Sequence, residues 1–372
     1  MKFLPNKTRQ TILEIDLDAV LHNFKYFKNL VEPSTKFIMV IKAFAYGAGI
    51  KQIAKLLDTR KIEYLAVACI DEGVELKDAG IDHPIMILNA EWNGFQKLIE
   101  YGLEPVIHDL DSFVEFKKAL KTFGSYHKPY PIHLKVDTGM HRLGFSQENL
   151  PDLLKNIIDS ESLIVKSIMS HLVASGDSKF DNFTNQQIHL FEKMSLEINS
   201  ILGYKVNRHI LNSGGIERFP QAQYDMVRLG IGLYGLSAQT QELKSVYSWR
   251  AAISQITEVK KGESVSYNRS WIAKRDSRIA TVFVGYADGL SRALGNEKWH
   301  MKHNGKKLPI VGDICMDSCM VDVTDSNVKN GDELIIFENQ QEVSQMAAAE
   351  NTIHYEVLTR ISKRVNRVYK KS

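Results

Sequence analysis

The sequence predicts an α/β fold, a (β/α)8 barrel of the TIM type followed by a second, mainly β domain. Up to about residue 240, short apolar runs rich in Val and Ile alternate with longer amphipathic stretches, which is typical of a parallel sheet covered by helices. Beyond that point helical periodicity is weak, and short β-branched segments are joined by turns that contain Gly-Asp or Lys-Lys-Gly-Glu.

The first part of the chain contains eight apolar runs that we interpret as barrel strands. They are residues 37–43, 64–70, 84–90, 104–109, 132–137, 163–171, 208–213 and 226–235. Helical patterns such as 49–61 and 184–202 lie between them. Eight strands in a segment of this length favour a closed barrel over an open doubly wound sheet. We expect the barrel over residues 12–240 and the β domain over 241–372, with a strand in residues 1–18 as a candidate to pack on the latter.

Composition narrows the class of protein. The 47 Lys and Arg residues nearly balance 44 Asp and Glu residues, so the net charge of +3 offers no basic surface for nucleic acid or an anionic membrane. Three cysteines suit a reducing compartment and form neither a disulfide framework nor a paired zinc motif. The first residues lack a signal-peptide core, and no apolar run approaches a membrane span. We expect a cytoplasmic protein without a metal site.

Polar residues collect at the ends of the predicted strands, where a barrel of this kind has its active site. Lys42 follows the apolar residues 37–41, and small apolar residues come after it. A lysine at a strand end is usually solvated, but apolar neighbours favour a desolvated amine with a lowered pKa that can form a Schiff base. The other polar residues of this kind are Lys135, Asp137, Arg142, His171, Asn212, Ser213 and Arg228.

Glycine-rich segments follow the last two strands, at Gly214-Gly215 and Gly230-Ile231-Gly232. Exposed amides at these positions are the usual phosphate site of the barrel fold. Taken alone, His171 could be a core histidine and Ser213 a helix cap. A Schiff-base lysine that faces a phosphate site nevertheless indicates pyridoxal 5'-phosphate.

Along nearly its whole length the chain resembles the alanine racemase family, whose members are pyridoxal-phosphate enzymes with a barrel and a β domain. The matching segments are residues 14–23, 40–49, 134–144, 170–177, 212–215, 226–235, 264–268, 284–289, 312–324 and 355–369. The resemblance implies two catalytic bases, Lys42 for the D-face of the substrate and Tyr267 for the L-face. Without it, Tyr267 would read as a packed aromatic residue of a β segment.

The resemblance also implies the remaining site residues. Those that contact the cofactor are Lys42, Tyr46, Leu88, His171, Asn212, Ser213, Arg228, Gly230, Ile231 and Tyr355. Those that contact the substrate are Arg142, Met316 and Tyr286, and Lys135 matches a lysine that is often carbamylated and orients Arg142. Tyr267 and Met316 match residues that come from the second subunit, so we expect a head-to-tail homodimer with shared active sites.

The function implied by the family is interconversion of L- and D-alanine, which supplies D-alanine for peptidoglycan. The alternatives are a broad-specificity racemase for serine or other amino acids, a fold-related amino acid decarboxylase, and a non-catalytic carrier of pyridoxal phosphate. Arg228 disfavours the decarboxylase, which would place a carboxylate at the pyridine nitrogen, and the second domain disfavours the carrier. Four positions depart from the family pattern and put substrate preference in question: Phe44, Ala48, His141 and Asp313.

Overall fold

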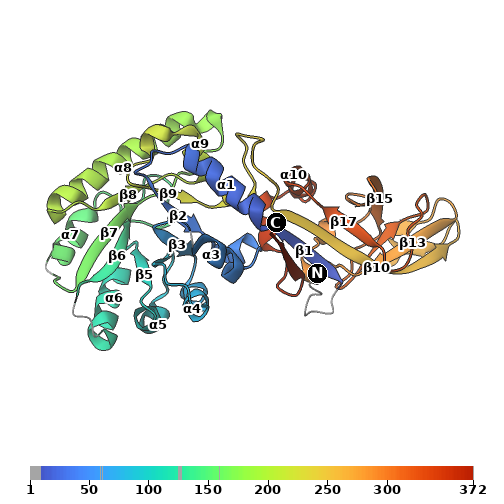
Figure 1. The fold of residues 1–372 in the computed structure, drawn as a ribbon, viewed down its shortest axis with the longest axis horizontal. Helices are drawn as coiled ribbons and strands as arrows, with labels where there is room; N and C mark the ends of the chain where they lie inside the picture. The colour runs from blue at the N-terminus through green and yellow to red at the C-terminus, as the bar shows by residue number, and fades with distance from the viewer. Residues whose placement is uncertain (1–9, 59, 61, 125–127, 159, 372) are drawn as a thin grey trace.

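The protein has a round α/β part and an elongated β part that lie side by side (Figure 1). The structure is a computed structural model that describes residues 10–58, 60, 62–124, 128–158 and 160–371. The predicted barrel with a mainly β second domain is confirmed.

Eight parallel strands form the barrel. They are β2 (Lys36–Val40), β3 (Tyr64–Val67), β4 (Ile85–Ile87), β5 (Glu104–Ile107), β6 (Tyr130–Lys135), β7 (Leu163–Met169), β8 (Asn207–His209) and β9 (Met226–Leu229). Their order is β8-β7-β6-β5-β4-β3-β2-β9, and the Arg228 amide donates to the Leu211 carbonyl (3.0 Å), which connects β9 to the end of β8. Each strand overlaps a predicted apolar run and ends before the run does, because the last residues of the runs form the loops at the rim; β2, β6 and β8 begin one or two residues before their runs.

Helices surround this barrel in Figure 1. They are α1 (Leu17–Asn29), α3 (Ile50–Asp58), α4 (Ile70–Asp78), α5 (Phe95–Glu100), α6 (Leu110–Phe123), α7 (Leu150–Ile158), α8 (Asp181–Leu202) and α9 (Ser213–Arg218). Their apolar faces cover the sheet; in α3, for example, Ile53 and Leu57 are fully buried one turn apart.

The second domain is built on another eight-stranded sheet. Its strands are β1 (Thr11–Asp16), β10 (Tyr247–Val259), β13 (Ser277–Val282), β14 (His300–His303), β15 (Lys306–Val311), β16 (Cys319–Asp322), β17 (Glu333–Phe337) and β18 (Asn366–Lys370). A small ribbon, β11 (Ser264–Val265) and β12 (Trp271–Ile272), and two helices, α10 (Gln340–Ala349) and α11 (His354–Thr359), complete it.

The first described strand, β1, belongs to this second sheet. It pairs antiparallel with β10 and parallel with β18, so segments from both ends of the chain lie side by side. Residues 1–9 lie outside the described part of the chain. Helix α1 then leads from this sheet into the barrel, which ties the two domains together at the start of the chain.

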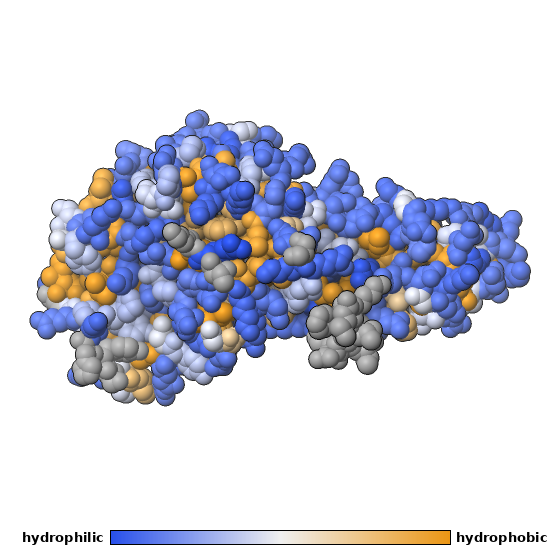
Figure 2. All heavy atoms as spheres, in the orientation of Figure 1, coloured by the Kyte–Doolittle hydropathy of each residue, from blue (hydrophilic) through white to orange (hydrophobic). Residues whose placement is uncertain are grey.

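The surface shown in Figure 2 is mostly hydrophilic, with smaller hydrophobic areas among the charged and polar residues. Among the described residues, no helix combines the length and the apolar character that crossing a membrane would require.

Candidate active site

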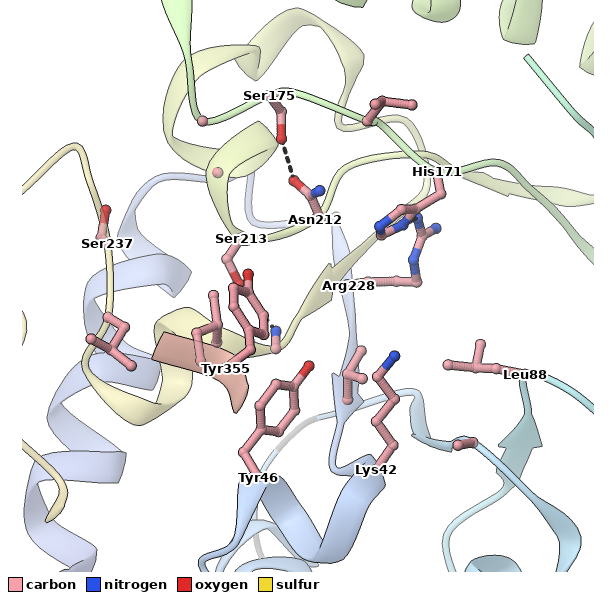
Figure 3. Close-up of a pocket in the computed structure, with 18 of the residues that line it drawn as sticks. Lys42, Tyr46, Leu88, His171, Ser175, Asn212, Ser213, Arg228, Ser237 and Tyr355 are labelled. Atoms are coloured by element: carbon pink, nitrogen blue, oxygen red, sulfur yellow. Dashed lines mark hydrogen bonds between the residues drawn. The ribbon is translucent and has the colours of Figure 1, made fainter. Parts of the chain in front are cut away.

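A cavity of about 570 Å³ opens at the carboxyl ends of the barrel strands. Twelve of the residues proposed from the sequence line it: Lys42, Tyr46, Leu88, Lys135, Arg142, His171, Asn212, Ser213, Arg228, Gly230, Ile231 and Tyr355. In Figure 3, Lys42 and Tyr46 extend from one segment toward the space below Arg228 and His171. The structure therefore brings together side chains from strand ends that are far apart in the sequence.

Lys42 does not end a strand, as the sequence suggested, but begins a short left-handed turn. Strand β2 ends at Val40, and φ lies between 52° and 56° for the next four residues after Lys42, Ala43 to Tyr46. Left-handed backbone costs a non-glycine residue roughly 1–2 kcal/mol. The chain holds this turn partly through Glu72, whose carboxylate accepts hydrogen bonds from the amides of Phe44 (3.2 Å) and Ala68 (2.9 Å).

Side chains of the second domain bind the end of the same turn. Tyr247 on β10 donates its hydroxyl proton to the Tyr46 carbonyl (2.9 Å). From β18, Arg367 Nε donates to the Gly47 carbonyl (3.0 Å), and the Tyr369 hydroxyl to the Ala48 carbonyl (2.9 Å). We call these three side chains the carbonyl clamp. It connects the β domain to three consecutive residues beside Lys42.

Two of the positions that depart from the family pattern lie in this turn and fit its contacts. The ring of Phe44 lies below the cationic groups of Lys363 (4.7 Å) and Arg367 (5.4 Å). Ala48 is fully buried, and its carbonyl is the acceptor for Tyr369. The Phe44 ring face attracts the two cations, so both positions contact the second domain, Phe44 through its ring and Ala48 through its carbonyl.

The cavity carries an excess of positive charge. Burial, together with Arg142 and Arg228, lowers the pKa of the Lys42 amine, although Glu72 opposes this. Burial and the nearby Arg142 and Arg228 lower the pKa of Lys135 to about 8. Such a site suits an anionic ligand, and the lowered pKa values increase the neutral, nucleophilic fraction of each amine.

Arg228 is a buried donor with one nitrogen left over for a ligand. Its Nη1 and Nη2 atoms donate to three backbone carbonyls and to the ring nitrogens of His209 (2.7 Å) and His171 (3.3 Å). Its Nε makes no hydrogen bond to the described part of the chain, and the residue lines the cavity. Burial and the Arg228 charge lower the pKa of His171 well below its usual range, so this imidazole is neutral.

Backbone amides and hydroxyl groups lie together at the end of the cavity where Tyr46 and Ser213 are found, away from Arg228 (Figure 3). The Ser213 hydroxyl oxygen accepts hydrogen bonds from the amides of Gly230 and Gly232, both at 3.1 Å. Asn212 caps α9 by accepting from the Gly215 amide (2.9 Å), which leaves the amides of Ser213 and Gly214 in the unpaired first turn. A side chain at Gly230 would collide with the Tyr46 hydroxyl, because its Cβ would lie 2.8 Å away. This donor set fits a phosphate group.

Three further residues proposed from the sequence lie outside the cavity, on the second domain. Tyr267, Met316 and Tyr286 are 67%, 54% and 41% exposed. Tyr267 lies in a 3-10 helix, Tyr267–Arg269, and not in the β segment that the sequence suggested. Its loop is joined to that of Met316, since Asp313 hydrogen-bonds Ser266 (2.8 Å) and Ser270 (3.1 Å) through its carbonyl and amide.

The other two departures also have defined contacts. His141 adopts φ +53° and pairs with Asp137 (3.0 Å) next to Arg142. Burial opposes ionisation of Asp137, but hydrogen bonds from the amides of the same loop lower its pKa overall. The Asp313 carboxylate binds Arg292 (3.3 Å) and Asn296 (3.0 Å). Both residues order loops that carry proposed substrate contacts.

The sequence analysis missed Glu72 and the carbonyl clamp. No local pattern marks them, because each acts on backbone groups of a distant segment; Arg367 and Gly47, for example, are separated by 320 residues. A basic or aromatic residue in a β-type segment looks the same whether it faces solvent or a backbone carbonyl.

A barrel with a half-buried lysine of lowered pKa at one end of its site and a phosphate-type donor set at the other defines a class of enzyme that binds a phosphorylated aldehyde through an amine. Comparison with known proteins makes the assignment specific. Residues 15–238 match the alanine racemase N-terminal domain and residues 246–369 the alanine racemase C-terminal domain. The chain belongs to the alanine racemase family.

Relatives and solved structures agree along the full chain. Alanine racemase 2 of Caldanaerobacter subterraneus is 36% identical, with 98% of this chain and 96% of that protein covered. Alanine racemase of Clostridium novyi is also 36% identical, with 96% and 95% covered. The alanine racemase structure from Clostridium difficile 630 has a TM-score of 0.89 at 33% identity, with 98% and 96% covered. That from Bartonella henselae, with covalently bound pyridoxal phosphate, has a TM-score of 0.86 at 32% identity, with 97% and 99% covered.

Proposed function

We propose that this protein is an alanine racemase that uses pyridoxal 5'-phosphate. The observation that carries the proposal is the position of Lys42, whose amine has a lowered pKa and lies in a cavity with a phosphate-type donor set. The family assignment and the pyridoxal phosphate in the Bartonella henselae relative support the same cofactor. By analogy with the relatives' names, the substrate is alanine. As the resemblance to the family implies, the product D-alanine would supply peptidoglycan.

The residues of the cavity divide into those that hold the cofactor and those that hold the substrate. Lys42 would bind the aldehyde carbon, Arg228 Nε would donate to the pyridine nitrogen, and His171 and Leu88 would cover the ring. The phosphate would be held by Tyr46, Asn212, Ser213, Gly230, Ile231 and Tyr355. Bound pyridoxal phosphate supplies the electron-withdrawing system that acidifies the Cα proton of the amino acid.

Arg228 is expected to limit this electron withdrawal. A guanidinium donates a hydrogen bond but keeps its proton, so the pyridine nitrogen stays unprotonated. A weaker electron sink favours return of the proton to Cα over side reactions. A carboxylate at this position would have the opposite effect, and that difference separates the proposed racemase from a decarboxylase.

Racemisation requires a proton to leave one face of Cα and another to arrive on the opposite face. We assign the D-face to the Lys42 amine and the L-face to the Tyr267 hydroxyl; one would take the proton from Cα while the other returns a proton on the opposite face. Arg142 binds the substrate carboxylate with Met316 and Tyr286, and a carbamylated Lys135 would supply the negative charge that orients Arg142.

Tyr267, Met316 and Tyr286 reach such a site only from a second copy of the chain. All three are exposed on the β domain, and none lines the cavity of the same chain. We therefore assign the active form to a head-to-tail homodimer with two shared sites. The joined loops of Tyr267 and Met316 would then enter the partner's cavity as one unit.

Chiral chromatography tests the reaction. The holoenzyme is incubated separately with L-alanine and D-alanine, and both are expected to reach an equal mixture because enantiomers have the same free energy. A panel of the nineteen chiral L-amino acids determines whether serine or another substrate is preferred. Release of CO2 from lysine, ornithine or diaminopimelate without racemisation would contradict the proposal and favour the decarboxylase.

A further inference from the structure

A continuous chain of polar side chains runs through the barrel interior, which is usually filled with branched apolar residues. It starts at Arg228 on β9 and passes through His209 on β8, Ser167 on β7 and His133 on β6 to Glu104 on β5. The distances are 2.7 Å from Arg228 Nη1 to His209 Nδ1, 2.9 Å from His209 Nε2 to Ser167 Oγ, 2.7 Å from Ser167 Oγ to His133 Nδ1, and 3.0 Å from His133 Nε2 to a Glu104 carboxylate oxygen.

The three residues in the middle of this row of polar side chains are fully buried. His133, Ser167 and His209 are 0% exposed, and the Arg228 residue is 4% exposed. Polar groups buried in this way destabilise a protein unless their hydrogen bonds are complete. Here every nitrogen and oxygen atom of the three middle side chains has a hydrogen-bond partner in the same row of polar side chains. Tyr64 completes the far end, with its hydroxyl bonded to Glu104 and its ring packed edge-on against His133 at 5.1 Å.

The two charged ends determine where each proton lies. Arg228 only donates, so Nδ1 of His209 is an acceptor and its proton lies on Nε2, which donates to Ser167. The Ser167 hydroxyl then donates to Nδ1 of His133. The remaining His133 proton lies on Nε2 and donates to the Glu104 carboxylate. All donors point from the guanidinium toward the carboxylate, and both imidazoles are neutral.

Arg228 has no carboxylate partner of its own among the described residues, although its charge is buried. We propose that Glu104 is the counter-ion of Arg228, and that His209, Ser167 and His133 are positioning residues that connect the two charges. The chain holds the guanidinium in the plane in which Nε faces the cavity, and it balances a cation that no residue of the cavity balances. This inference deepens the proposed function, because it takes Arg228 to face the pyridine nitrogen.

Two variants separate the charge from the hydrogen bonds. Glu104→Gln removes the negative charge but keeps an amide oxygen as acceptor for His133. Ser167→Ala breaks the chain in the middle. Ser195→Ala is the matched control, because this buried hydroxyl on α8 bonds only to the Glu192 carbonyl of its own helix.

The visible absorbance band of the bound cofactor, followed as a function of pH in the intact holoenzyme, is the first readout. Around Lys42 the charged groups are Arg142, Arg228, Lys135 and, with opposite sign, Glu72. Loss of the Glu104 charge disfavours protonated forms in this positive site. The midpoint of the pH-dependent change in the band is therefore expected to move to lower pH in Glu104→Gln, while Ser195→Ala matches the wild type.

Steady-state kinetics with L-alanine is the second readout. Both variants are expected to lower kcat by about fivefold or more, with KM unchanged because neither residue touches the substrate. In Ser167→Ala this is the scale of one lost buried hydrogen bond, and in Glu104→Gln it is the scale of a hydrogen bond to a charged group that becomes a neutral one. A wild-type pH midpoint and wild-type kcat in both variants would overturn the inference, and Glu104→Gln alone decides if Ser167→Ala does not fold. A wild-type protein without any visible band would instead contradict the proposed function itself.

Discussion

At the scale of single residues, the proposed function requires the Lys42 amine. Replacing Lys42 with Ala removes the only group assigned to bind the cofactor covalently, so the variant is expected to lose the visible absorbance band after dialysis. Lys36→Ala is the control, because this lysine begins β2, the strand that leads to Lys42, but pairs with Glu63 (2.7 Å) away from the cavity. Colour that persists in Lys42→Ala would contradict the assignment.

The pKa of Lys135 gives a second prediction at this scale. With a pKa of about 8, roughly a tenth of this amine is neutral at pH 7 and most of it at pH 9. Only the neutral amine attacks CO2, so carbamate formation on Lys135 is expected to increase as the pH rises over this range. A carbamate carbon signal in ¹³C NMR of enzyme kept in ¹³C-bicarbonate measures it, and Lys135→Arg should lack the signal. An equal signal in both proteins would place the carbamate elsewhere.

At the scale of elements, the left-handed turn and the carbonyl clamp form one unit. Tyr247→Phe and Tyr369→Phe each remove one hydroxyl from a carbonyl acceptor, and each is expected to lower the free energy of unfolding by about 1–3 kcal/mol. Tyr234→Phe is the matched control, since this buried hydroxyl has no hydrogen-bond partner in the described part of the chain and its loss should cost little. Thermal unfolding of the three variants measures the difference. Equal Tm values for all three would show that the clamp does not stabilise the turn.

The barrel strands could be predicted from the sequence, whereas the left-handed turn after Lys42 could not. Apolar runs and intervening helical patterns predicted all eight barrel strands, because burial on both faces leaves a continuous apolar signal. The convergence of Lys42, His171 and Arg228 on one rim followed from the geometry of the barrel. The left-handed backbone at Ala43 to Tyr46 could not be predicted, because local propensity opposes it and contacts from β10 and β18 stabilise it.

The row of hydrogen-bonded polar side chains from Arg228 to Glu104 also could not be predicted from the sequence. His133 and Glu104 each stand in an apolar run, where a single polar residue has no visible partner. Their partners come from neighbouring strands, and only the strand order β8-β7-β6-β5 places them in line. Sequence patterns thus predict which face of a strand is buried, but not which buried polar groups meet.

At the scale of the whole molecule, the β domain has two tasks in this account. Through the carbonyl clamp it supports Lys42 of its own chain. Through Tyr267 and Met316, which are exposed at the surface, it is proposed to complete the site of a partner chain. A homodimer would then contain two sites, each with a lysine from one subunit and a tyrosine from the other.

Co-expression of two inactive variants shows whether two subunits share each active site. Lys42→Ala and Tyr267→Phe are each expected to be inactive or nearly so, but a mixed dimer pairs an intact lysine with an intact tyrosine in one of its two sites. Random pairing makes half of the dimers mixed, so co-expression of the two chains should restore about a quarter of wild-type alanine racemisation. If each site came from a single chain, the mixture would stay as inactive as the two variants are alone, and the shared two-base site would be wrong.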